Sequence, residues 1–186
     1  MDLQPVFQAI DRLSAEKPTV LIAVDGRCGA GKTTLAAVLA RRYSARVFHT
    51  DDFYLPFARR TADWRERPAA NMDFDRLRRE VLTPARAGET VHYRRYRAHA
   101  DRLEAEELLP PCPVSVLEGS YSLHPALRTA FDLSIFLTCS PDTQTARLQA
   151  REGENFAGFR TLWIPLEEGY FQQHRVRETC DLVIEA

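Results

Sequence analysis

The sequence is short of lysine, of paired cysteines and of long hydrophobic runs. Only two of its 25 basic residues are lysines, Lys17 and Lys32, and the others are all arginines. The four cysteines are widely scattered and form no C-x-x-C pair, so neither a zinc site nor a disulfide framework is predicted. No apolar run approaches the ~20 residues that a membrane span needs, and the first residues do not resemble a signal peptide. With a net charge of −1, we expect a cytoplasmic protein that has neither nucleic acid nor a membrane as a partner.

The length and composition fit one domain. The chain has 186 residues, which is enough to bury a sizeable core, and its hydrophobic fraction of 45% is ordinary for a globular protein. The sequence contains no internal repeat and no break in composition. We therefore predict a single domain over residues 1–186.

A phosphate-binding loop is present between an apolar run and a helical pattern. Residues 26–33 read Gly-Arg-Cys-Gly-Ala-Gly-Lys-Thr, which fits G-x-x-x-x-G-K-[ST]. Glycines let successive backbone N–H groups face one oxyanion, and the N-terminus of the following helix adds partial positive charge. Lys32 is expected to reach the β- and γ-phosphates of a nucleotide, and the Thr33 hydroxyl is expected to bind Mg²⁺. The alternative is an ordinary glycine-rich turn.

All residues of this loop are assigned to nucleotide binding, together with two arginines of a later helix. The assigned residues are Gly26, Arg27, Cys28, Gly29, Ala30, Gly31, Lys32, Thr33, Thr34, Arg147 and Arg151. A helix N-terminus can lower the pKa of a nearby thiol, so Cys28 is also a candidate for oxidation that blocks nucleotide binding.

Hydrophobic patterning predicts five buried strands separated by helices. The predicted strands cover residues 19–25, 47–50, 114–117, 133–137 and 181–185, and the main predicted helices cover residues 2–16, 35–43, 74–82, 141–152 and 159–174. Continuous apolar strands are typical of a parallel sheet that is buried on both faces. We therefore predict an α/β fold with a doubly wound five-stranded parallel sheet, of the P-loop NTPase type that nucleoside and nucleotide kinases have.

Two segments outside the sheet are expected to flank the site. Residues 55–100 form a substrate-side insertion, in which 57–72 is predicted to be a mobile loop and 88–97 a short hairpin or edge strand. Residues 98–113 are interpreted as a connector. A small lid is predicted at about residues 147–160, because Gly153 and Gly158 flank a segment suited to hinge motion.

Polar residues follow the predicted strands at the edge where such sheets place their chemistry. They are Asp25, Asp51, Asp52, Glu118 and Thr138. Ligands bind at the carboxyl ends of parallel strands, so we expect three of these strand ends to converge around the γ-phosphate.

The remaining motifs favour a small-molecule kinase among the proteins that use such a loop. The N-K-x-D motif that reads guanine and the L-S-G-G-Q signature of transport ATPases are both absent. Phosphoryl transfer needs charge neutralisation and a group that accepts the proton of the attacking hydroxyl. Lys32, Mg²⁺, Arg147 and Arg151 are candidates for the first role, and Asp51 or Asp52 for the second. Alternatively, Asp51 caps a turn, and the two arginines pair with glutamates on a solvated face.

Four stretches together resemble the uridine kinase/phosphoribulokinase family. They are Thr-Asp-Asp-Phe-Tyr at 50–54, Val-Leu-Glu-Gly-Ser-Tyr at 116–121, the stretch 123–128 and Asp-Leu-Ser-Ile-Phe-Leu at 132–137. The segments 71–76 and 163–168 are similar to those of bacterial uridine kinase-like proteins, and the Asp-Asp-Phe-aromatic segment also resembles nicotinamide riboside kinases. The resemblance covers residues 19–185.

This resemblance implies an ATP- and Mg²⁺-dependent enzyme that phosphorylates the 5′-hydroxyl of a ribonucleoside such as uridine or cytidine. It implies Asp51 as general base, Glu118 near the metal, Arg147 and Arg151 as lid arginines over the phosphates, and Tyr54 and Tyr96 near the nucleoside. We therefore expect Asp51, Lys32 and Arg151 to be catalytic, Thr33 and Glu118 to bind the metal, and Asp51, Tyr54, Asp73 and Tyr96 to lie on the substrate side. Two segments depart from the uridine kinase pattern, at 67–71 and at 96–98. Other acceptors therefore stay open, namely nicotinamide riboside, pantothenate or a sugar phosphate, as does a nucleotide-binding regulator without a small-molecule acceptor.

Overall fold

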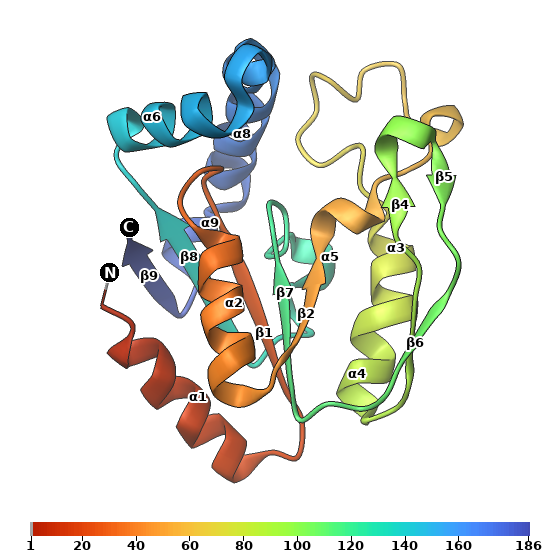
Figure 1. Ribbon diagram of the computed structural model, residues 1–186, viewed down its shortest axis with the longest axis vertical. Helices are drawn as coiled ribbons and strands as arrows, with labels where there is room; N and C mark the ends of the chain where they lie inside the picture. Colours follow the sequence, from red (N-terminus) through yellow and green to blue (C-terminus); the bar gives the residue numbers. More distant parts are fainter. Residues whose placement is uncertain (1) are drawn as a thin grey trace.

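A five-stranded parallel sheet forms the centre of the molecule, in a computed structural model that describes residues 2–186. The strand order is β2-β7-β1-β8-β9 (Figure 1). The strands are β1 (Val20–Gly26), β2 (Arg46–His49), β7 (Val114–Glu118), β8 (Leu133–Thr138) and β9 (Leu182–Glu185). β1 is central and pairs in parallel with β7 on one side and with β8 on the other. This confirms the predicted doubly wound α/β sheet.

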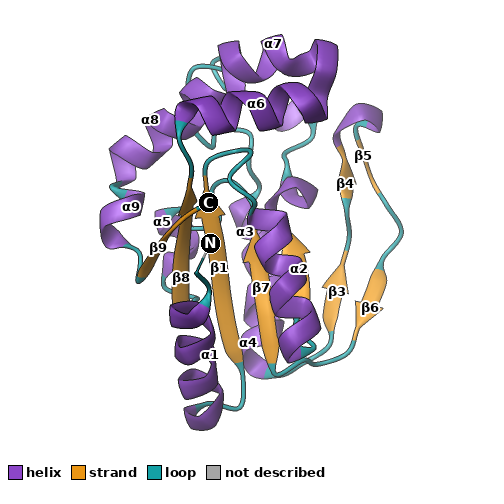
Figure 2. Ribbon diagram, turned by 60° about the vertical axis from the view of Figure 1, so that its left-hand side comes forward, coloured by secondary structure: helices purple, strands orange, loops and turns teal. Residues whose placement is uncertain are grey.

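Helices cover both faces of the sheet (Figure 2). They are α1 (Gln4–Glu16), α2 (Lys32–Tyr43), α3 (Phe74–Leu77), α4 (Thr83–Ala87), α5 (Pro125–Arg128), α6 (Pro141–Glu152), α7 (Phe156–Gly158), α8 (Ile164–His174) and α9 (Val176–Thr179). Within residues 2–186, no helix is both long enough and apolar enough to cross a membrane.

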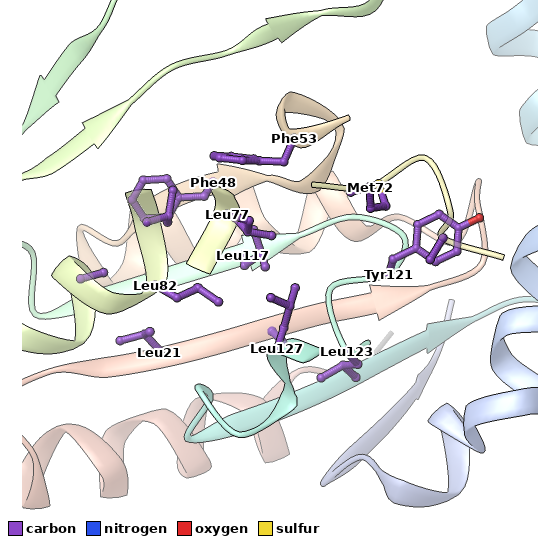
Figure 3. Close-up of a cluster of buried hydrophobic side chains, with 14 of the residues drawn as sticks. Leu21, Phe48, Phe53, Met72, Leu77, Leu82, Leu117, Tyr121, Leu123 and Leu127 are labelled. Carbon is purple, nitrogen blue, oxygen red and sulfur yellow. The ribbon is translucent and has the colours of Figure 1, made fainter. Parts of the chain in front are cut away.

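Alternate residues of β1 belong to two separate cores. Leu21 and Ala23 pack with side chains of α3, α4, α5 and α8, in the cluster that Figure 3 shows. Ile22 and Val24 pack with α1 and α2 on the opposite face. Because both faces are buried, the strand needs apolar residues at every position, and this explains the unbroken apolar run of the sequence.

Beside β2 lies an arm of two antiparallel pairs, which corrects the interpretation of residues 98–113 as a plain connector. β3 (Val91–Tyr93) pairs with β6 (Glu107–Leu109), and β4 (Tyr96–Arg97) pairs with β5 (Arg102–Leu103). β5 and β6 have only two and three residues and are mostly exposed, so their sequence carries no alternation that identifies a strand. The centroid of the Tyr93 ring lies 5.3 Å from that of Phe48 and 5.7 Å from that of Phe53, so Tyr93 packs the arm against the sheet.

Two helical stretches are longer than predicted. The helix expected over 74–82 continues to Ala87, as α3, a π-helical turn at Arg78–Leu82 and α4. The stretch 153–158, expected to be flexible, is a 3₁₀ turn at Gly153–Asn155 followed by α7. A second π-helical turn, Phe159–Trp163, then leads directly into α8.

The loop between β2 and α3 closes on itself. The Leu55 N–H donates to the Asn71 carbonyl at 2.7 Å, and the Asp73 N–H donates to the Phe53 carbonyl at 2.7 Å. In Figure 1 this loop, drawn in yellow, stands above the carboxyl ends of the strands on the side opposite α6 and α8. The fold thus places two separate segments around one end of the sheet.

Candidate active site

One large cavity lies at the carboxyl ends of β1, β2 and β7. Its volume is about 1030 Å³. Its walls come from the phosphate-binding loop, the ends of β2 and β7, α6 and the turn before α8; the lining residues include Lys32, Thr33, Asp51, Tyr54, Glu118, Arg147 and Trp163. The volume lies at the upper end of the range for ligand sites, so the cavity has room for two small molecules.

The phosphate-binding loop has the backbone that its glycines allow. Gly26 has φ +132°, and a Cβ there would lie 1.9 Å from the Leu137 carbonyl oxygen, so no side chain fits. Gly31 has φ +96° and immediately precedes α2. The Lys32 ammonium curls back and donates to the Gly26 carbonyl at 2.6 Å. Lys32 is 9% exposed and lines the cavity, so its charge is held at the bend of the loop.

Most of the residues assigned to the nucleotide lie on this wall. Cys28, Gly29, Ala30, Gly31, Lys32, Thr33, Thr34, Arg147 and Arg151 line the cavity. Gly26 and Arg27 are not among its lining residues. The Arg27 guanidinium instead makes two hydrogen bonds to the Glu168 carboxylate of α8, at 2.6 and 3.1 Å.

Oxygen ligands suited to Mg²⁺ face each other beside the loop. The Thr33 hydroxyl donates to Glu118 Oε1 at 3.2 Å. His49 Nδ1 lies 2.6 Å from the same oxygen, and this hydrogen bond raises the pKa of His49. No group of three or more His, Cys, Asp or Glu side chains with metal-binding geometry occurs in residues 2–186. The pair still fits Mg²⁺, because that ion is usually bound by one or two protein oxygens together with phosphates and water.

The two neighbouring aspartates have different surroundings. Asp51 opens onto the cavity, and its Oδ1 accepts a hydrogen bond from the Tyr54 hydroxyl at 2.8 Å. Asp51 is exposed to the solvent in the cavity, and the protein atoms packed around it desolvate its carboxyl in part and raise its pKa. The Asp52 carboxylate accepts a hydrogen bond from the Tyr93 hydroxyl at 2.5 Å and lies 3.7 Å from Arg95 Nε. Both aspartates line the cavity, but Asp52 is held by the arm, whereas Asp51 is the more exposed of the two and has no such partner among the described residues.

The two arginines of α6, Arg147 and Arg151, line the cavity beside the phosphate-binding loop. The Arg147 guanidinium donates to the Gly29 carbonyl of the phosphate-binding loop at 3.1 Å. Arg151 pairs with its neighbour Glu152 at 2.5 Å and lies over the Phe159 ring. Both side chains are exposed, so they remain able to change partners.

Two residues expected on the substrate side lie elsewhere. Asp73 is buried; it caps α3 by accepting from the Arg76 N–H and pairs with Arg59 at 3.0 Å. The Tyr96 ring is buried in the arm, and its hydroxyl donates to Asp101. Neither residue lines the cavity.

The expectation of a lowered pKa at Cys28 is wrong. Burial and the nearby Glu167 carboxylate raise the pKa of the thiol. The Cys28 N–H donates to Glu167 Oε2 at 2.9 Å, so a negative carboxylate lies beside the thiol and opposes the effect of the helix N-terminus on its pKa.

Two buried carboxylates hold the loop in place, and the sequence analysis gave this role to neither of them. Glu167 of α8 is buried; it accepts the Cys28 N–H and the Ser120 hydroxyl and lines the cavity. Asp25 is fully buried and accepts from the N–H groups of Gly26 and Leu123 and from the Tyr170 hydroxyl. The position of Asp25 at the end of a predicted strand indicated that it lies near the site. Glu167 had no such indication, because the sequence does not reveal how its helix packs against the loop.

Known structures share this fold at low sequence identity. A possible uridine kinase from Bacillus stearothermophilus matches with a TM-score of 0.71 and 20% identity, over 97% of this chain and 100% of that chain. D-glycerate 3-kinase from Cryptococcus neoformans var. grubii matches with a TM-score of 0.65 and 15% identity, over 97% of this chain and 92% of that chain.

Sequence comparison identifies the family. A search of curated proteins found no significant match. The profile of the Phosphoribulokinase / Uridine kinase family matches residues 21–154, which include the phosphate-binding loop, Asp51, Glu118 and both arginines of α6. The chain therefore belongs to the Phosphoribulokinase / Uridine kinase family.

Proposed function

We propose that this protein transfers the γ-phosphoryl group of ATP to a hydroxyl of a small molecule, and that this hydroxyl is the 5′-hydroxyl of a ribonucleoside such as uridine or cytidine. Family membership supports a P-loop phosphotransferase of the uridine kinase/phosphoribulokinase type. One observation supports the acceptor hydroxyl. Asp51, a carboxylate without a cationic partner among the described residues, opens onto the same cavity as the phosphate-binding loop.

In this proposal the loop and α6 hold the donor. The loop N–H groups and the Lys32 ammonium bind the phosphates, and Arg147 and Arg151 of α6 neutralise charge that develops during transfer. Thr33 and Glu118 would hold Mg²⁺, which supplies charge neutralisation at the phosphates when it is bound.

Asp51 acts on the acceptor. The acceptor oxygen forms its bond to the γ-phosphorus while the bond from that phosphorus to the bridging oxygen of ADP breaks. The Asp51 carboxylate accepts the proton of the attacking hydroxyl, and its raised pKa makes it a better proton acceptor than an ordinary surface aspartate. The Tyr54 hydroxyl orients the carboxylate by donating to Oδ1.

ADP release in the presence of Mg²⁺–ATP tests the proposal. The coupled assay uses uridine, cytidine, nicotinamide riboside, pantothenate and ribulose 5-phosphate as acceptors. We expect uridine or cytidine to raise the rate well above the rate with ATP alone. Equal rates with and without every acceptor would instead support a nucleotide-binding regulator with weak hydrolysis.

A further inference from the structure

A histidine at the end of β2 contacts the carboxylate that is placed at the metal. His49 Nδ1 lies 2.6 Å from Glu118 Oε1, and His49 lines the cavity. An ionised carboxylate only accepts hydrogen bonds, so the Nδ1–H of His49 is the donor. This N–H is available in one neutral tautomer and in the protonated ring alike, so the contact does not require a charged histidine.

The pairing of β2 with β7 brings the two side chains together. His49 and Glu118 are the last residues of these neighbouring parallel strands and are direct partners in their register (Figure 1). Val47 and Val116, two positions earlier, both pack in the core that α2 covers. Because side chains alternate between the faces of a sheet, His49 and Glu118 point to this same face, where Thr33 lies in the first turn of α2.

Two donors from different elements share one oxygen of Glu118. The Thr33 hydroxyl donates to Oε1 at 3.2 Å, and His49 donates to the same atom. Within residues 2–186, no hydrogen bond reaches Oε2 of this carboxylate. The Glu118 side chain is only 8% exposed, so its second oxygen has little contact with water and is the one left for a cation.

A glutamate needs such restraint to serve as a well-placed metal ligand. Its carboxylate follows several rotatable bonds, and the last torsion has no sharp preference. The hydrogen bond from Thr33 is longer than is usual for a hydroxyl donor, whereas the one from His49 is short. His49 is therefore the stronger of the two restraints on the carboxylate.

The backbone of His49 is held independently of its ring. The His49 N–H donates to the Tyr93 hydroxyl of the arm at 3.3 Å. The His49 side chain is 41% exposed, so its replacement removes little packing. A substitution at this position thus acts mainly on Glu118.

We propose that His49 is a positioning residue for the metal: its Nδ1–H fixes the Glu118 carboxylate so that the second oxygen is available to Mg²⁺ that binds together with the nucleotide. The proposal rests on the function proposed above and adds to the same site a side chain that does not itself bind the ion. Hydrogen-bond partners of metal ligands typically contribute about 10- to 100-fold to metal affinity.

Calorimetry of nucleotide binding measures this contribution without turnover. The probe is adenylyl imidodiphosphate, a non-hydrolysable ATP analogue, which is titrated into the protein with excess Mg²⁺ and again with EDTA. The ratio of the two dissociation constants gives the coupling between metal and nucleotide. We expect His49→Leu to leave the affinity in EDTA unchanged and to reduce the ratio toward one, by as much as about 100-fold.

Two further variants are controls. His49→Asn keeps an N–H donor near the position of Nδ1 and should restore most of the Mg²⁺ effect. His92 of the arm makes the same kind of contact, with Nδ1 3.0 Å from Glu106 Oε2, but it is exposed and does not line the cavity. His92→Leu should leave the ratio at the wild-type value. Circular dichroism shows whether each variant keeps the fold.

The outcomes separate a positioning role from a structural one. Equal ratios for the wild type and His49→Leu would overturn the proposal, even with a lower melting temperature, because His49 would then only join two strands. An equal loss of affinity with Mg²⁺ and with EDTA would also overturn it. So would a wild-type protein whose affinity for the analogue is the same with and without Mg²⁺.

Failure of the positioning role is distinguishable from failure of the kinase proposal. A reduced ratio in His49→Leu, without any acceptor-stimulated ADP release by the wild type, would support the role of His49 and contradict the kinase. Acceptor-stimulated ADP release by the wild type, together with equal ratios, would support the kinase and overturn the role of His49.

Discussion

The chain places Lys32, one of its two lysines, at the bend of the phosphate-binding loop. Lys32→Ala removes an ammonium that is positioned before the reaction begins, and such a preorganised donor contributes on the order of 3 kcal/mol to the transition state. We predict a fall in kcat of roughly 100-fold, measured by acceptor-stimulated ADP release, with an unchanged circular dichroism spectrum. Turnover near that of the wild type would contradict the role given to the loop.

The different surroundings of Asp51 and Asp52 predict different effects of the same substitution. Asp51→Asn keeps the size of the side chain and removes the proton acceptor, so the transfer rate should fall by roughly 10²- to 10⁴-fold. The lower end is expected, because the transition state of phosphoryl transfer is loose. ATP binding should be retained.

The matched control is Asp52→Asn. Asp52 accepts a hydrogen bond from the Tyr93 hydroxyl of the arm. Asp52→Asn should therefore lower the melting temperature, and it should reduce the transfer rate less than Asp51→Asn does. A larger fall in kcat for Asp52→Asn than for Asp51→Asn would indicate that Asp52 is the general base.

Sequence patterns predicted cavity-lining residues that lie at or just after the ends of strands. This class contains Asp51, Glu118 and the loop that begins at Gly26. Parallel strands have their carboxyl ends at one edge of the sheet, so the residues at those ends must meet there. Trp163 and Glu167 were not assigned, since each depends on how α8 docks against the loop, which is set by packing between distant segments.

At the scale of elements, α6 lies against the phosphate-binding loop and carries the two arginines that line the cavity beside it. We predict that Arg151→Ala lowers kcat by more than it weakens binding of ADP, because Arg151 pairs with Glu152 and has no partner in the loop among the described residues. Steady-state kinetics and ADP titration measure the two effects. An equal loss in both would mean that the arginine contributes only uniform binding.

The elements that sequence patterns predicted well are those with a repeated signal. Helix α1 buries apolar residues at helical spacing, namely Val6, Ile10 and Leu13. Helix α6 has a capping residue: Ser140 accepts the Thr143 N–H at 3.2 Å, and Pro141 opens the helix. The strands of the arm are too short for any period. Phe159–Trp163 lies within the helix predicted over 159–174, but it forms a π-helical turn, which the 3.6-residue period does not describe.

At the scale of the whole molecule, the buried Asp25 makes stability depend on pH. Burial raises its pKa in the folded state to about 6 from 3.8. Between these values the folded protein keeps a proton that the unfolded chain releases, so this contribution to stability falls as pH rises through that window.

Asp25→Asn removes this titration. We predict that the free energy of unfolding of the wild type, measured relative to that of Asp25→Asn, decreases by about 2 kcal/mol between pH 4 and pH 7. Urea denaturation of both proteins at each pH measures the difference, and the comparison cancels the contributions of the other titrating groups. A difference that is constant with pH, or that grows as pH rises, would contradict the raised pKa.

Identification of the reaction product tests the central claim most directly, because it follows the phosphoryl group itself. The wild type and Asp51→Asn are incubated with Mg²⁺–ATP and each acceptor of the panel, and the products are separated and identified by mass spectrometry. We predict that a ribonucleoside gains one phosphoryl group at its 5′-oxygen in the wild-type reaction and that Asp51→Asn forms far less of this product. Conversion of ATP to ADP and inorganic phosphate, with every acceptor recovered unchanged, would contradict the account.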